Sequence, residues 1–174
     1  TMPNIETEFS SGTVSVEAKT KVQNQSSQDT EIIVQNTILN YADDTVFTQP
    51  VQSEQQRIKA GETIELTQTL KADHPKLWST ETPNLYKMRT EIIVDDKVVD
   101  CYDTRFGFRW FSMDQDNGFS LNGEYMKLQG VCMHHDQGAL GAVANEAATA
   151  RQMRIMKEMG ANAIRVSHNP ASDV

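Results

Sequence analysis

Residues 128–174 read LQGVCMHHDQGALGAVANEAATARQMRIMKEMGANAIRVSHNPASDV, and this stretch predicts a strand, a helix and a second strand. The apolar run 130–133 favours the first strand. Asn145 can cap a helix that Gly160 ends, and the apolar run 163–166 favours the second strand. Two strands joined by a crossover helix are the unit of a parallel α/β fold.

Polar side chains gather where each of these two strands ends. In parallel α/β folds, ligands bind beyond the carboxyl ends of the strands. We therefore expect a ligand site at this edge. Its predicted members are His134, Asp136, Arg165, His168 and Asn169, with His135 as a weaker candidate.

Residues 1–110 are predicted to form an antiparallel β-sandwich. Apolar and polar residues alternate over 14–22, and the same period of two recurs through 32–38, 64–70 and 86–94. Short strands with regular turns and no helical period are typical of an immunoglobulin-like sandwich of about 100 residues.

The period changes after Arg109, and we place a second domain over 111–174. Asn122-Gly123 lies between two short apolar runs and predicts a tight hairpin turn, because both positions tolerate positive φ. The aspartate pairs Asp43-Asp44 and Asp95-Asp96 are expected to be solvated turns, the second of them joining two strands.

Two features of the sequence predict burial in the core. An apolar stripe at helical spacing is formed by Met153, Ile155, Met156 and Met159. The two cysteines, Cys101 and Cys132, fall in different predicted domains, so two buried free thiols are favoured over a disulfide.

The composition excludes several classes of partner. Of 174 residues, 38% are hydrophobic and 23% are charged, as in a globular protein. The net charge of −8 argues against nucleic acid and anionic membrane, which require a basic face. No apolar run is long enough to span a bilayer, and the chain starts without a signal-peptide pattern, so the sequence names no compartment.

A single strand-helix-strand unit cannot close a parallel sheet, because its strands leave open edges and bare apolar surface. We therefore expect the chain to be the front part of a larger enzyme. As it stands, its open strands are expected to pair with a second copy, or to stay mobile while the sandwich is rigid.

Several short motifs occur in order along the chain. They are LWS at 77–79, PNLY at 83–86, FGFR at 106–109, LNG at 121–123, GVCMHHD at 130–136, LG at 140–141, MKEMGANAIR at 156–165 and SHNP at 167–170. Together they closely resemble glycoside hydrolase family 2, and most of all its β-galactosidase branch. Residues 1–76 fit that family only by their strand pattern.

The resemblance implies a catalytic core made of a jelly-roll domain, an immunoglobulin-like sandwich and a (β/α)8 barrel. This chain would hold the sandwich and an incomplete barrel segment: hairpin, strand, helix and strand. The substrate of the whole enzyme would be a terminal β-galactoside, cleaved with retention by two glutamates on later barrel strands. A β-glucuronidase or a β-mannosidase remains an alternative, because sugar choice depends on residues outside this chain.

The acidic residues of the chain agree with that implication. Retaining hydrolysis needs two carboxyl groups about 5 to 5.5 Å apart. Asp136 and Asp173 are the acids near the predicted edge, while Glu146 and Glu158 would stand roughly 18 Å apart along one helix. No convincing pair exists, so the chain alone is expected to be inactive. The alternative is a non-catalytic sandwich that serves as a spacer or interaction module.

Each predicted site residue has a functional and a plainer interpretation. The resemblance places His134 and His168 at the sugar subsite, whereas either could simply be a loop histidine at a strand end. Arg165 could orient a catalytic carboxylate or form an ordinary salt bridge inside the barrel. Asp136 could bind a hydroxyl, position His134 or be a solvated loop acid.

No cofactor is expected in this chain, and the resemblance leaves room for a divalent or sodium ion in the whole enzyme. The histidines and Asp136 lack tight ligand spacing, which disfavours zinc. Carbohydrate is the expected partner of the whole enzyme.

Overall fold

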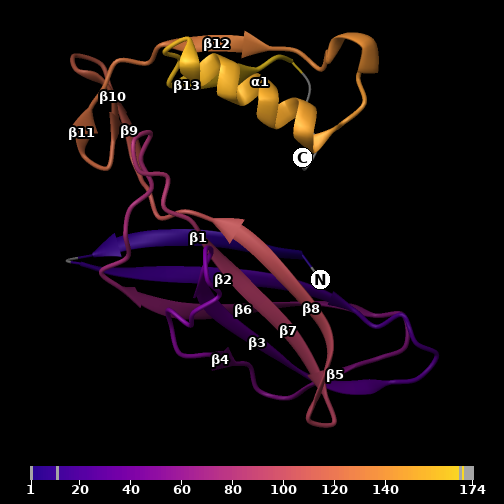
Figure 1. Ribbon diagram of the computed structural model, residues 1–174. Helices are drawn as coiled ribbons and strands as arrows, with labels where there is room; N and C mark the ends of the chain where they lie inside the picture. The colour runs from indigo at the N-terminus through magenta and orange to yellow at the C-terminus, as the bar shows by residue number, and fades with distance from the viewer. Residues whose placement is uncertain (1, 11, 169, 171–174) are drawn as a thin grey trace. The chain divides into compact units, whose positions relative to one another are not determined.

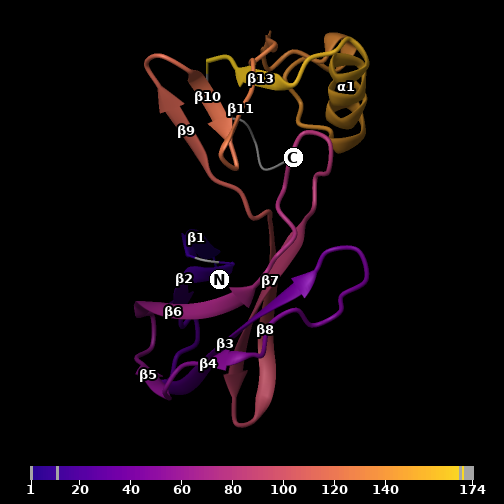
Figure 2. The same ribbon diagram turned by 90° about the vertical axis from the view of Figure 1, so that its left-hand side faces the viewer.

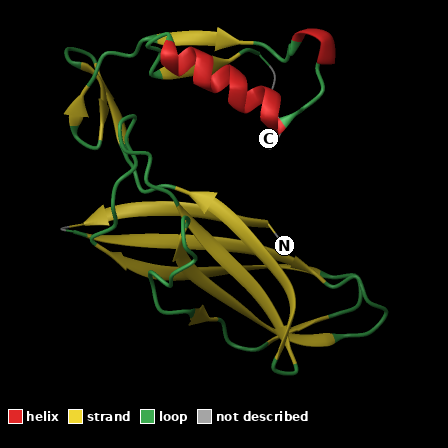
Figure 3. Cartoon of the chain, viewed as in Figure 1, coloured by secondary structure: helices red, strands yellow, loops and turns green. Residues whose placement is uncertain are grey.

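The computed structural model describes residues 2–10, 12–168 and 170, and the chain divides into two compact units, Thr1–Arg109 and Trp110–Val174. Strands dominate the described residues, and the helical segments are η1 (Gly138–Leu140) and α1 (Glu146–Glu158), as Figure 3 shows. The predicted mostly β fold is confirmed. None of the described helices is both long and apolar enough to cross a membrane.

The first unit is a sandwich of two antiparallel sheets (Figure 1 and Figure 2). One sheet has the order β1-β2-β6, from β1 (Met2–Ser10), β2 (Thr13–Gln23) and β6 (Thr63–Asp73). The other has the order β4-β3-β7-β8, and β5 also pairs with β3; its strands are β3 (Thr30–Asn40), β4 (Val51–Gln52), β5 (Gln56–Ile58), β7 (Tyr86–Val94) and β8 (Lys97–Phe106). The sandwich is as predicted, although β1, β4 and β5 were not expected individually.

The buried side chains follow the period of two read from the sequence. Along β2 every second residue is buried, so the predicted inward face is confirmed. These residues form two apolar clusters between the sheets. The first contains Val14, Val16, Ala18, Ile38, Leu70, Ala72, Tyr86, Met88 and Phe108, and the second contains Val22, Ile32, Val34, Ile58 and Ile92.

Four buried polar residues, which we call the polar layer, stand between the two clusters. Thr20, Asn36, Gln68 and Thr90 lie on β2, β3, β6 and β7, and none is more than 7% exposed. Thr90 Oγ1 donates to Asn36 Oδ1 at 2.5 Å, and Asn36 Nδ2 donates to Gln68 Oε1 at 2.8 Å. Gln68 Nε2 donates to two backbone carbonyls at 3.0 and 3.2 Å. Thr20 Oγ1 is buried without a partner among the described residues.

The FGF sequence at the end of β8 forms a tight aromatic contact. Phe108 is fully buried, and its ring meets those of Tyr86 and Phe106 edge-on at centroid distances of 4.9 and 5.1 Å. A Cβ at Gly107 would lie 3.0 Å from Trp78 Cβ and would also crowd a backbone carbonyl at 3.2 Å. Only glycine lets the backbone approach so closely here.

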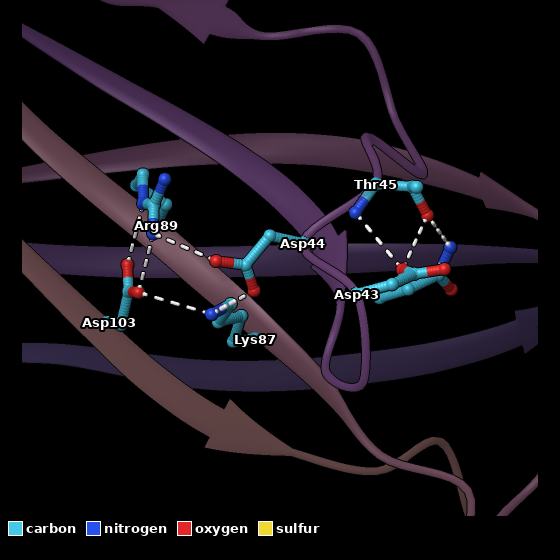
Figure 4. A network of polar contacts seen from close by, with 7 residues as sticks. Asp43, Asp44, Thr45, Lys87, Arg89 and Asp103 are labelled. Atoms are coloured by element: carbon cyan, nitrogen blue, oxygen red, sulfur yellow. Dashed lines mark hydrogen bonds and ion pairs between the residues drawn. The ribbon is translucent and has the colours of Figure 1, made fainter.

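A network of ion pairs covers the outer side of β7 and β8 (Figure 4). Asp44 is exposed, as predicted for a turn residue, and it also pairs with Lys87 and lies 3.9 Å from Arg89. Arg89 also binds Asp103 through two bonds of 2.9 and 2.8 Å. Its guanidinium lowers the pKa of Asp103, chiefly through this hydrogen bonding. Asp43 instead accepts from the hydroxyl and then the backbone N–H of Thr45, and these hydrogen bonds lower the pKa of Asp43.

The second unit begins with a three-stranded sheet of order β11-β10-β9. Its strands are β9 (Phe111–Asp114), β10 (Gly118–Leu121) and β11 (Glu124–Tyr125). Asn122 and Gly123 have φ of 54° and 85°, which confirms the predicted hairpin turn between β10 and β11. The strand β9 was not predicted, because only four residues carry its pattern.

The strand-helix-strand prediction is confirmed. β12 (Gly130–Met133) and β13 (Ala163–Val166) pair in parallel, and α1 lies beside them (Figure 1). Asn145 Oδ1 accepts from the N–H of Ala148 at 3.0 Å, so it caps α1 as expected. Gly160 follows the helix with φ of 92°, the left-handed conformation that ends helices.

Two predictions of burial are wrong in the second unit. Met153 and Met156 are half-buried, but Met159 is 67% exposed and Ile155 is 40% exposed, since the described residues offer α1 only a two-stranded sheet to pack on. Cys132 is exposed for the same reason.

Cys101 is also exposed rather than buried. It lies on β8, which among the described strands pairs only with β7 and so forms the edge of its sheet. Both cysteines are free, as expected.

Candidate active site

The two parallel strands of the second unit end at one edge. β12 and β13 are in register from Gly130 opposite Ala163 to Met133 opposite Val166. The N–H of Ser167 donates to the carbonyl of Met133 at 2.8 Å, which extends the pairing one residue past β13. The segments that start at His134 and Ser167 therefore leave the sheet side by side.

The rings of His134 and His168 meet at this edge. Their centroids are 5.4 Å apart and their planes lie at 73°, an edge-to-face contact, and both residues are exposed. The peptide bond between Ser167 and His168 is cis. Two adjacent imidazoles offer both donor and acceptor nitrogens, which suits the recognition of a polyhydroxylated ligand.

Arg165 stands on the same face of the sheet as Cys132, which is its register partner. Its Nη1 donates to Ser167 Oγ at 3.2 Å and contacts Cys132 Sγ at 3.9 Å. Hydrogen bonding from Arg165, followed by that from Ser167, lowers the pKa of the Cys132 thiol. Among the described residues no carboxylate forms an ion pair with Arg165.

Asp136 makes its hydrogen bonds within its own loop and with α1. Its carboxylate accepts from the N–H of Gly138 at 2.9 Å and so stabilises the turn before η1. Gln152 of α1 donates to the carbonyl of Asp136 at 3.2 Å, and Gln137 donates to Thr149 at 2.9 Å. These bonds tie the loop after β12 to the helix. Asn169, the last predicted site residue, lies outside the described residues.

Asn162 has a role that sequence reasoning missed. Its side chain accepts from the N–H of Gln129 at 2.7 Å and donates to the carbonyl of Lys127 at 2.9 Å, while its own N–H donates to the Gln129 carbonyl at 3.1 Å. Three bonds thus hold the entry of β12 against the entry of β13. The only signal in the sequence is an asparagine directly before a strand.

The side chains at this edge form no recognisable metal site among the described residues. Within the described ranges, no group of three or more His, Cys, Asp or Glu side chains could hold an ion. An ion site in the whole enzyme stays a prediction.

Comparison with known proteins identifies the chain. The model of glycosyl hydrolases family 2 matches residues 2–109, and the model of that family's TIM barrel domain matches residues 114–174. The chain belongs to glycosyl hydrolase family 2. In this family's terms, the first unit is the immunoglobulin-like sandwich, and β12, α1 and β13 are the start of the barrel.

Relatives within family 2 act on more than one sugar. A β-galactosidase of Bacteroides ovatus is 47% identical over 112 residues, which are 64% of this chain and 13% of that protein. A putative β-glucuronidase of Formosa agariphila is 46% identical over 100 residues, 58% of this chain and 10% of that protein. The structure of a Bacteroides uniformis β-glucuronidase aligns with a TM-score of 0.87 at 34% identity, over 97% of this chain and 20% of that one. The chain thus spans about an eighth of the first of these relatives.

Proposed function

We propose that this chain is part of a retaining exo-glycosidase that hydrolyses terminal β-galactosides. The observation that carries the proposal is the His134–His168 pair at the carboxyl edge of β12 and β13, within a segment that belongs to a glycosidase barrel. In such barrels, catalytic residues come from the carboxyl ends of several strands.

The residues of this chain would bind and orient the sugar. The two imidazoles would hydrogen-bond neighbouring hydroxyls of the terminal residue, and the Arg165 guanidinium would orient a catalytic carboxylate. The bond cleavage itself would need a pair of carboxyl groups about 5 to 5.5 Å apart, acting as nucleophile and acid/base.

A β-glucuronidase is the second candidate. A putative β-glucuronidase is nearly as similar in sequence as the β-galactosidase, at 46% against 47% identity. A Bacteroides uniformis β-glucuronidase of 34% identity has been solved covalently bound to a cyclophellitol-6-carboxylate aziridine, a compound that carries a uronate-like carboxylate.

The experiment is an assay of the whole protein that contains this chain. Hydrolysis of 4-nitrophenyl β-D-galactoside, with less than roughly one-tenth of that kcat/KM on the β-D-glucuronide, would support the first candidate. The reverse ratio, together with covalent labelling by the carboxylate aziridine, would support the second. Inactivity towards both would contradict the proposal.

A non-catalytic binding module is tested on the chain alone. Calorimetric titration with galactose and glucuronic acid should give no heat of binding, because a subsite that is only part of a barrel lacks most of its contacts. Stoichiometric binding by the isolated chain would favour the module.

A further inference from the structure

Among the described residues of the candidate site, Ser167 is the most deeply buried. It is 3% exposed, although the preceding Val166 is 49% exposed and the following His168 is exposed. Its N–H is fixed by the carbonyl of Met133 at 2.8 Å. A serine held by its backbone and shielded from water presents its hydroxyl in one place.

That hydroxyl accepts from Arg165. The distance from Nη1 to Ser167 Oγ is 3.2 Å, and the same nitrogen lies 3.9 Å from Cys132 Sγ. An exposed arginine otherwise samples many rotamers. A buried acceptor two residues along the same segment restricts these rotamers before any ligand arrives.

We propose that Ser167 is a positioning residue, which holds the Arg165 guanidinium at the carboxyl edge of the barrel strands so that it can receive a carboxylate. This inference rests on the proposed glycosidase function for its catalytic consequence, but not for its geometry. Ser167 occupies the first position after β13, immediately before His168. Its side chain therefore bonds to the arginine, and its backbone leads directly into one member of the histidine pair.

Cys132 provides a reporter that does not depend on activity. Its thiolate is the form that reacts with iodoacetamide, and the nearby guanidinium stabilises that form. In the 174-residue chain with Cys101→Ser, alkylation of Cys132 should be at least roughly threefold slower at pH 7 in Arg165→Met. Ser167→Ala should slow it in the same direction, and Ser167→Thr should restore it.

Two variants separate positioning from a direct effect of the hydroxyl on the thiol. In the Arg165→Met background, Ser167→Ala should slow alkylation by a clearly smaller factor than in the parent chain, because the arginine it positions is gone and only the direct hydrogen bonding of Ser167 to the thiol is lost. An undiminished effect there would overturn the proposal. Ser120→Ala is the matched control, since it also removes a buried hydroxyl of this unit, one bonded to Ser112 at 2.7 Å. Its alkylation rate should equal that of the parent chain.

Kinetics of the whole protein complete the test. Ser167→Ala should lower kcat at least roughly tenfold while KM changes less than about threefold, and Ser167→Thr should recover most of kcat. A fully active Ser167→Ala enzyme would overturn the positioning role. If the wild type hydrolyses no aryl glycoside, the proposed function fails, whereas the alkylation result still decides whether Ser167 positions Arg165.

Discussion

The imidazole rings of His134 and His168 meet edge to face with centroids 5.4 Å apart, although each follows a different strand. The contact exists because β12 and β13 are parallel and in register, so the residues just past their ends leave the sheet together. A helical crossover between the strands is what makes this arrangement possible.

The histidine pair leads to the first prediction. In the whole protein, His168→Ala should lower kcat/KM for an aryl β-glycoside by at least roughly tenfold, about 1.4 kcal/mol of transition-state stabilisation. The reason is the loss of a hydrogen-bonding group at the sugar subsite. Lys157→Ala is the control, because Lys157 is exposed in the last turn of α1 and belongs to no predicted site. A loss of less than roughly tenfold in His168→Ala would remove His168 from the site.

The polar layer of the sandwich leads to the second prediction. Asn36→Leu should lower the free energy of unfolding by about 2 to 4 kcal/mol, because it removes the hydrogen-bond partner of the buried Gln68 Oε1 and of the buried Thr90 Oγ1. Thr20→Val should be neutral or stabilising, since the hydroxyl it removes is buried and unpaired among the described residues. Urea denaturation of the chain measures both. If Thr20→Val lowered the free energy of unfolding as much as Asn36→Leu does, this account would be contradicted.

The three hydrogen bonds of Asn162 to Lys127 and Gln129, which we call the clamp, lead to the third prediction. Asn162→Ala removes the bonds to the Gln129 N–H and the Lys127 carbonyl, which should cost about 1 to 3 kcal/mol and free the entry of β12. Hydrogen exchange should show faster exchange at the Gln129 amide and unchanged protection in β2 and β3. Asn162→Asp keeps the acceptor and loses the donor, so its effect should be intermediate. Unchanged exchange at Gln129 in Asn162→Ala would argue against the clamp.

Local sequence pattern was sufficient for the elements whose residues carry a complete period. The bounds of β12 and β13, the cap at Asn145 and the hairpin at Asn122 could all be read from neighbouring residues. Because the ends of parallel strands share an edge, the meeting of His134 with His168 also followed from local pattern.

Features that depend on pairing between distant segments could not be predicted in this way. Asp44 meets Lys87 only because β3 and β7 are neighbours in one register. Ser167 bonds to a group of β12, and Asn162 bonds to residues directly before β12, so nothing near them in the sequence signals their roles. The exposure of Cys132 depends on how little of the described chain covers its sheet.

The ion pairs on the sandwich lead to the last prediction, a dependence of stability on pH. Hydrogen bonds from Arg89 lower the pKa of Asp103 below the value of about 3.9 that it has in the unfolded chain. The carboxylate therefore stabilises the fold above that unfolded value, and the contribution disappears as the pH falls through the lower, folded value. Because both side chains are 34% exposed, solvent screening limits the effect to about 0.5 to 1 kcal/mol.

The test compares Asp103→Asn with the wild type by urea denaturation across the pH range. The free energy of unfolding of the variant should be lower by this amount at pH 7 and should equal that of the wild type near pH 2. Glu54→Gln is the control, an exposed acid outside the network, and it should follow the wild type at every pH. A difference between wild type and Asp103→Asn that stays constant down to pH 2 would mean that packing, rather than charge, holds Asp103 in place.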